Sequence, residues 1–290
     1  MGALVAFAGN SLLARMALGP GFIDPAAFTA VRLGSGGLTL FLLAAFRRPP
    51  EVPRVGRRAA PVALFVYALA FSVAYVQLGV GAGALILFGA VQVTMIAWGL
   101  RAGERPRLAT WVGLGCALCG LAVLTLPGAH APSVGAAVLM CAAGVAWGVY
   151  SLLGRGPGDP IHRTTTNFGW SVPLAVIAVA VAWPMVHTTP RGVVYAIASG
   201  SVASGLGYVL WYAALPGLSA TAAAISQLVV PVLAAAGAAL LLGEPLTPRL
   251  LTAGTAILGG VALALAGRRS YTTLASASRT RRPPRRAQSN

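Results

Sequence analysis

The fold of this chain can be deduced from residues 133–153, SVGAAVLMCAAGVAWGVYSLL, which contain no charged side chain. A helix of about 20 mostly apolar residues is long enough to cross the ~30 Å hydrocarbon layer of a bilayer. This stretch has that length and composition, and the turn-forming residues Gly156-Pro157-Gly158 follow it closely. It therefore predicts a transmembrane helix.

Nine further apolar runs of similar length lie along the 290 residues. The ten expected spans are roughly 2–19, 25–46, 59–78, 82–100, 108–126, 133–153, 165–187, 192–213, 218–242 and 249–267. Only 9% of the residues are charged, whereas a soluble domain carries about 25% because its surface faces water. The expected fold class is therefore an all-α integral membrane protein with ten transmembrane helices, and its first partner is the lipid bilayer.

The arginines predict how these helices are oriented. All 21 basic residues are Arg, and 17 of them fall in the C-terminal tail and in the loops between spans 2 and 3, 4 and 5, and 6 and 7. The opposite side of the membrane has only Arg191 and Arg249. Because loops rich in Lys and Arg stay cytoplasmic, we expect a multi-pass protein of the cell membrane with both termini inside. This orientation accounts for the net charge of +16, so no nucleic-acid partner is expected.

Similarity between the two halves of the chain indicates a duplication. Ser11-Leu12-Leu13-Ala14-Arg15 recurs as Ser151-Leu152-Leu153-Gly154-Arg155, and Gly103-Glu104 recurs as Gly243-Glu244, both at an offset of 140 residues. Because five spans per half is an odd number, the second copy must insert upside down. We expect two inverted five-helix repeats, residues 1–126 and 133–267, and a disordered basic cytoplasmic tail over residues 268–290. Secondary transporters often have this plan, with the substrate site near the midplane between the halves.

Three motifs point to one family. Gly9-Asn10-Ser11 with Arg15 lies in the first span, and Pro25-Ala26-Ala27-Phe28 followed by Arg32 opens the second. The most specific motif runs from Gln227-Leu228-Val229-Val230-Pro231 through Leu242-Gly243-Glu244-Pro245 to Gly259-Gly260. In these residues the chain resembles the EamA-type transporters of the drug/metabolite transporter (DMT) superfamily. The resemblance implies a ten-helix, two-repeat carrier, usually an exporter of amino acids, metabolites or drugs.

Two arginines lie inside spans, where charge is costly and marks a candidate site. Arg32 lies about seven residues into the second span, roughly 10 Å deep at 1.5 Å per residue. It could attract a carboxylate or phosphate of the substrate, or it could be a structural arginine that snorkels or pairs with Asp24. Arg15 lies nearer the outer end of the first span, and a structural role is favoured there.

Uncharged polar residues complete the candidate site. Asn10, Gln92 and Gln227 fall near mid-depth on spans 1, 4 and 9, where an amide can bind substrate or join helices. The substrate-binding hypothesis therefore comprises Asn10, Arg32, Gln92 and Gln227. Pro231 on span 9 is a candidate hinge, because proline frees a backbone carbonyl and can kink a helix.

Aromatic residues gather toward the cytoplasmic ends of several spans. They are Trp147, Tyr150, Trp170, Tyr208, Trp211 and Tyr212. An interfacial aromatic belt is favoured for them, with a stacking surface for an aromatic substrate as the alternative.

The acidic residues and histidines do not form an enzymatic site. The five acids, Asp24, Glu51, Glu104, Asp159 and Glu244, lie in loops or at span ends, so they cannot form a catalytic carboxylate pair at membrane depth. The three histidines lack metal-ligand spacing. We therefore expect no catalytic residues, no metal, no cofactor and no enzymatic activity. Glu104 and Glu244 are expected to cap helix ends or to pair with arginine.

The function predicted from these features is secondary transport of a small molecule by alternating access, most simply export of amino acids, organic acids or drugs. A flippase or exporter of a lipid-linked or amphiphilic substrate on the same fold is the first alternative. A membrane enzyme, receptor or scaffold is the second, and the lack of catalytic pairs counts against it. The chain is expected to act as a monomer or homodimer.

Overall fold

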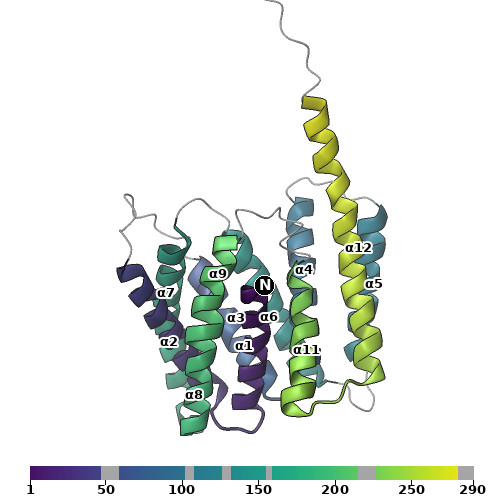
Figure 1. Ribbon diagram of the computed structural model, residues 1–290. Helices are drawn as coiled ribbons and strands as arrows, with labels where there is room; N and C mark the ends of the chain where they lie inside the picture. The colour runs from purple at the N-terminus through teal and green to yellow at the C-terminus, as the bar shows by residue number, and fades with distance from the viewer. Residues whose placement is uncertain (47–58, 102–107, 126–131, 155–158, 215–225, 280–290) are drawn as a thin grey trace, which may run out of the picture.

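The computed structural model describes residues 1–46, 59–101, 108–125, 132–154, 159–214 and 226–279. Within these ranges the backbone is almost entirely helical, and the β-type pairing is an isolated bridge between Ile23 and Thr188. The helices stand side by side in a bundle, and α12 extends beyond one end of it (Figure 1).

The bounds of the helices agree with most of the expected spans. In chain order they are α1 Gly2–Leu18, α2 Pro25–Ala45, α3 Ala59–Tyr75, α4 Val80–Arg101, α5 Leu108–Thr125, α6 Val134–Leu153, α7 Pro160–Val181, η1 Trp183–Met185, α8 Pro190–Ala198, η2 Ser199–Leu206, α9 Gly207–Ala214, α11 Val229–Leu242 and α12 Pro248–Arg279. Because α8, η2 and α9 form one continuous span, Pro190–Ala214, each of the ten expected spans contains a helix of the structure.

Length and composition support membrane insertion. Five of the described helices are long and apolar enough to cross a bilayer by themselves, and the others are apolar helices of 10–17 residues. Large apolar side chains such as Phe41, Leu240 and Val181 are exposed on the outside of the bundle, where lipid can cover them. The prediction of an all-α integral membrane protein is confirmed.

The seventh span begins and ends earlier than expected, at Pro160 and Val181 rather than at 165 and 187. Asp159 caps the helix, because its Oδ1 accepts a hydrogen bond from the Ile161 amide at 3.0 Å. Within the polar first turns, the hydroxyl of Thr164 is satisfied inside the helix, because it donates to the carbonyl four residues back at 2.7 Å. The sequence prediction missed this capped polar segment because it relied on apolar runs.

The C-terminal helix also differs from the expectation. Helix α12 continues to Arg279, so the predicted disordered tail is wrong for residues 268–279. Between Gly267 and Pro283 the sequence has no proline and no further glycine, and nothing there breaks a helix. Residues 280–290, like most of the arginine-rich loops, lie outside the described residues.

The first helices of the two repeats, α1 and α6, run in opposite directions across the bundle. Arg15, near the end of α1, donates to the carbonyl oxygens of Tyr75 and Val76 at 3.2 and 3.1 Å. Ser133, which caps the start of α6, donates to Oε1 of Gln77 at 2.6 Å. The end of α1 and the start of α6 therefore lie beside the same turn between α3 and α4. Since α1 and α6 are the first helices of the two repeats, the repeats are inverted, as predicted.

An ion pair connects helices at the end of the bundle where α1 ends. Arg15 Nε lies 3.3 Å from Glu244 Oε1, and Glu244 Oε2 accepts a hydrogen bond from the Val80 amide at 2.7 Å. A carboxylate at this position satisfies a free amide of the first turn of α4 and suits the helix dipole. We call these contacts the Arg15–Glu244 clasp. They confirm the prediction that Glu244 caps a helix end and pairs with arginine, whereas Glu104 lies outside the described residues.

Small residues allow helices α5 and α12 to touch along their backbones. A Cβ atom added to Gly113 would overlap the backbone of Gly260 and Ala264, and one added to Gly260 would meet the backbone of Gly113 and Ala117. Such glycine contacts are typical of membrane helices, which have no hydrophobic driving force to join them in lipid.

Candidate functional site

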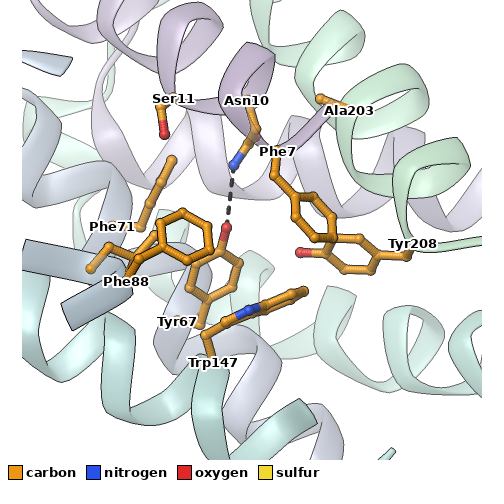
Figure 2. Close-up of a pocket in the computed structure, with 10 residues that line it drawn as sticks. Phe7, Asn10, Ser11, Tyr67, Phe71, Phe88, Trp147, Ala203 and Tyr208 are labelled. Carbon is orange, nitrogen blue, oxygen red and sulfur yellow. Dashed lines mark hydrogen bonds between the residues drawn. The ribbon is translucent and has the colours of Figure 1, made fainter. Parts of the chain in front are cut away.

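A small cavity lies inside the bundle where both repeats contribute side chains. It is lined by Phe7, Asn10, Ser11, Tyr67, Phe71, Leu87, Phe88, Trp147, Ala203 and Tyr208. Figure 2 shows the rings of Phe7, Tyr67, Trp147 and Tyr208 gathered around it, with Asn10 above them. The volume of the cavity that is open to the centre of a water molecule is only ≈ 10 Å³, about what a single water needs. The cavity in this arrangement of the helices is therefore too small for a molecule much larger than water.

The hydroxyl of Tyr67, on α3, joins three helices of the first repeat. Asn10 Nδ2, on α1, donates to it at 3.2 Å, as the dashed line in Figure 2 shows. Arg32 Nη2, on α2, donates to the same oxygen at 3.0 Å. Two donors from different helices thus converge on one neutral acceptor at the wall of the cavity.

Arg32 carries a buried positive charge beside this wall. Its side chain is 1% exposed, so it does not snorkel, and its Nε donates to Ser204 Oγ at 3.1 Å. The guanidinium carbon lies 5.1 Å from the ring centroid of Tyr67 and 4.9 Å from that of Phe71, close enough for cation–π attraction. Arg32 itself is behind these two rings rather than among the residues that line the cavity.

No carboxylate neutralises Arg32 in the part of the chain that the structure describes. Of the three carboxylates in that part, Glu244 pairs with Arg15 and Asp159 with His162. Asp24 instead accepts from the amides of Ala26, Ala27 and His187. The Nη1 atom of Arg32 is buried and has no hydrogen-bond partner among the described residues. The alternative of an Asp24-paired arginine is therefore not what the structure shows, and part of the hydrogen-bonding capacity of Arg32 remains available.

The second repeat reaches this network through a π-helix, η2. Ser199 Oγ donates to Asn10 Oδ1 at 2.7 Å, and Ser204 accepts from Arg32. Gly200 allows the close approach, because a Cβ there would overlap Ser35 and the carbonyl of Arg32. π-helical turns are rare and are frequent at functional sites. Neither the serines nor Tyr67 was predicted, although the cluster Ser199-Gly200-Ser201 inside an apolar run was a signal.

The four predicted binding residues do not form one group. Asn10 and Arg32 meet at Tyr67. Gln92, on α4, and Gln227, just before α11, are both buried, but neither belongs to the cavity lining. The substrate role of all four stays a prediction, and the geometry favours Asn10 and Arg32.

Pro231 occupies the third position of α11, which begins at Val229, and Leu228 before it is a turn. Proline is tolerated in a first helical turn because the amide it lacks has no intrahelical partner there. A break in the span therefore lies just ahead of Pro231, and its use as a hinge stays a prediction.

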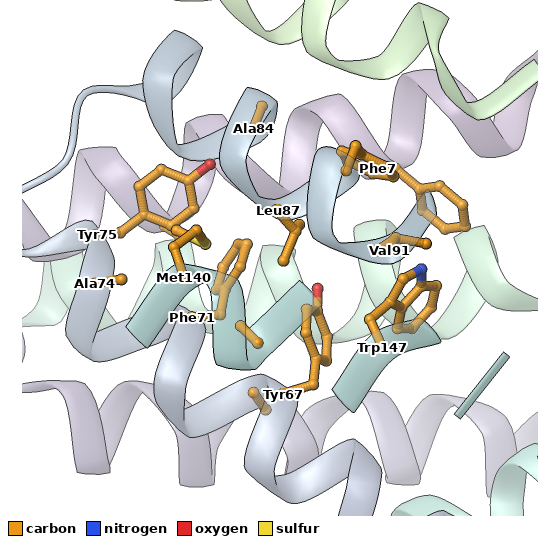
Figure 3. Close-up of a cluster of buried hydrophobic side chains, with 14 of the residues drawn as sticks. Phe7, Tyr67, Phe71, Ala74, Tyr75, Ala84, Leu87, Val91, Met140 and Trp147 are labelled. Atoms are coloured by element: carbon orange, nitrogen blue, oxygen red, sulfur yellow. The ribbon is translucent and has the colours of Figure 1, made fainter. Parts of the chain in front are cut away.

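The predicted aromatic belt is wrong for most of its members. Trp147, Tyr150, Tyr208, Trp211 and Tyr212 are all buried, and only Trp170 is exposed, at 69%. Trp147 lies 4.9 to 5.7 Å, between ring centroids, from Tyr208, Tyr67, Tyr150 and Phe7. Figure 3 shows how the rings on α3 and Trp147 on α6 point into the interior of the bundle. They form an internal aromatic cluster rather than an interfacial girdle.

Metal-ligating side chains are scattered. Within the described ranges, no group of three or more His, Cys, Asp or Glu side chains could hold a metal ion.

Comparison with known proteins agrees with this architecture. The model of the EamA-like transporter family matches residues 1–126 and 134–266. The uncharacterized protein PA1977 of Pseudomonas aeruginosa is 53% identical over 266 residues, which cover 92% of this chain and 93% of that protein. The uncharacterized transporter YwfM of Bacillus subtilis is 27% identical over 243 residues, 80% of this chain and 81% of that one.

A solved crystal structure has the same fold. Its TM-score is 0.62 at 21% identity, and the match covers 91% of this chain and 97% of the other. At this level of identity the likeness concerns the fold alone.

Proposed function

Because the chain belongs to the EamA-like transporter family, within the drug/metabolite transporter superfamily, we propose that it carries small metabolites with a carboxylate group across the cell membrane. The direction we propose is export, by alternating access, with both termini in the cytoplasm. The family membership supports transport, and the chemistry of the cavity wall supports the class of substrate.

The observation that carries the proposal is the unneutralised charge of Arg32. A buried charge without an opposite charge is costly, and among the described residues Arg32 donates to two hydroxyls and lies against two aromatic rings. An anionic substrate group would supply the missing partner. Arginine suits a carboxylate in particular, because its planar fork can donate two parallel hydrogen bonds.

The cavity lining supports an apolar, preferably flat, body for the substrate. Phe7, Tyr67, Trp147 and Tyr208 present ring faces and edges around the cavity (Figure 2), and aromatic surfaces favour flat partners. Since the cavity has room for about one water, substrate must enter when helices of the two repeats move apart. The inverted repeats supply a simple route, because exchanging their conformations opens the opposite end.

Transport into liposomes that contain the purified protein tests the proposal. Benzoate and benzamide are suitable probes, because they share a shape and differ in charge. We expect benzoate to be carried in preference, and Arg32→Gln to reduce benzoate flux at least tenfold while it changes benzamide flux little. Arg191→Gln, at an exposed arginine, is the matched control and should behave as wild type. Equal benzoate flux by wild type and Arg32→Gln, in protein that inserts normally, would remove Arg32 from the substrate site.

A further inference from the structure

The two terminal nitrogens of Arg32 are in different situations. Nη2 donates to the hydroxyl of Tyr67 at 3.0 Å, whereas Nη1 is buried without a partner among the described residues. A carboxylate that binds the guanidinium fork needs both nitrogens at once. Nη1 therefore still has hydrogen-bonding capacity for a carboxylate oxygen, whereas Nη2 already donates to a neutral phenol oxygen.

Tyr67 also separates Arg32 from the cavity. Its ring lines the cavity whereas Arg32 does not, and the guanidinium carbon lies 5.1 Å from the centroid of that ring. The ring packs on Trp147 with 5.0 Å between centroids. A substrate group in the cavity can thus reach Arg32 only when the side chain of Tyr67 moves.

From this geometry we propose that the Tyr67 hydroxyl is a placeholder for one oxygen of the substrate carboxylate. When substrate binds, one carboxylate oxygen takes Nη1 of Arg32, and the other displaces the Tyr67 oxygen from Nη2 and from Asn10 Nδ2. Hydrogen bonds to a charged acceptor are stronger than those to a neutral one, so the exchange favours carboxylates over neutral analogues. Tyr67 is then a positioning residue that tunes affinity and supplies an acceptor to Nη2 of Arg32 between transport cycles.

This inference rests on the proposed function, and it predicts an unusual result for Tyr67→Phe. The substitution keeps the ring but removes the acceptor that Arg32 Nη2 and Asn10 Nδ2 share when no substrate is bound. An unsatisfied buried donor costs about 1–3 kcal/mol, and a carboxylate removes that cost on binding. The dissociation constant for benzoate should therefore fall by roughly 5- to 140-fold, while that for benzamide changes much less.

The experiment is thermal unfolding of the detergent-purified protein, titrated with benzoate and with benzamide. Tyr75→Phe is the matched control, because Tyr75 lies on the same helix, is buried, and has a hydroxyl without a hydrogen-bond partner in the described residues. Without ligand, Tyr67→Phe should lower the unfolding midpoint more than Tyr75→Phe does. With benzoate, it should regain more stability than either the control or the wild type.

Two results would overturn the placeholder role. Benzoate affinity equal to that of Tyr75→Phe would show that the Tyr67 hydroxyl does not compete with substrate, and weaker affinity would show that it binds substrate directly. The proposed function is judged separately, by wild type and Arg32→Gln. If benzoate stabilises the wild type no better than benzamide does, the proposed substrate class is wrong, and the inference about Tyr67 falls with it.

Discussion

The Arg15–Glu244 clasp provides a quantitative test of whether its end of the bundle opens during transport. The clasp joins α1 to the residue beyond α11 and to the first turn of α4. Alternating access requires these elements to separate in one of the two states. Glu244→Ala removes the carboxylate on which all three elements converge.

The size of the effect follows from the contacts that are lost. The Arg15 and Glu244 side chains are 28% and 23% exposed, so solvent screens the ion pair and its contribution is taken as about 0.5–1 kcal/mol. The hydrogen bond from the Val80 amide to the charged carboxylate contributes about 1–2 kcal/mol after similar discounting. The closed arrangement thus loses roughly 2 kcal/mol, which corresponds to a roughly 30-fold shift toward the open one. Glu244→Gln, which can still accept from Val80, should shift it less.

Labelling of a cysteine at Ser11 measures this shift. Ser11 lines the cavity and is 1% exposed, one helical turn before Arg15. In a background without Cys116, Cys119 and Cys141, a membrane-impermeant maleimide should label Ser11→Cys slowly from outside the cell. The Glu244→Ala variant should be labelled up to about 30-fold faster, and Glu244→Gln should lie between the two.

Unchanged labelling would refute the reasoning. If Glu244→Ala lowers the unfolding temperature but leaves the Ser11→Cys labelling rate as it was, the clasp stabilises the fold and does not control opening. Equal rates for Glu244→Ala and Glu244→Gln would show that the ion pair alone matters and that the bond to Val80 does not.

Two other predictions concern packing and topology. Gly200→Ala should destabilise the protein by about 1–3 kcal/mol through overpacking, because its Cβ would overlap the Arg32 carbonyl. Gly169→Ala, with open space around its Cβ, should not. Similar unfolding temperatures for both variants would contradict the close contact between η2 and α2. The arginines predict that the C-terminus is cytoplasmic and that the loop 127–132 is outside. A fluorescent protein fused after Asn290 should therefore fluoresce, and alkaline phosphatase inserted in the loop 127–132 should be active. The reverse pattern would show that the topology is inverted.

Features that depend on the local sequence were predicted well. The apolar runs predicted the membrane spans because lipid requires each span to satisfy its own backbone with helical hydrogen bonds. The errors lay at span ends. The polar start of α7 depends on the Asp159 cap, and α12 continues to Arg279 where the composition resembled a disordered tail.

The candidate site was predicted only in part. The depth of Asn10 and Arg32 in their spans follows from residue counting. Asn10 proved to line the cavity, and Arg32 lies behind the ring of Tyr67, which lines it. Depth does not say which face of a helix points inward. For that reason Gln92 and Gln227, at similar depth, were grouped with them although they do not line the cavity, and five buried aromatic residues were assigned to a lipid interface.

The sequence alone determined the membrane environment, the ten spans and the inverted repeat, because these depend on hydrophobic length and on the parity of crossings. The tertiary structure decided that Tyr67 and Ser204 accept hydrogen bonds from Arg32 and that Ser199 donates one to Asn10. Arg32 and Ser204 are 172 residues apart in the chain, and nothing local in either segment specifies their meeting. The contact arises from the packing of α2 against η2, which supplies a hydrogen-bond acceptor to a buried guanidinium that would otherwise lack one.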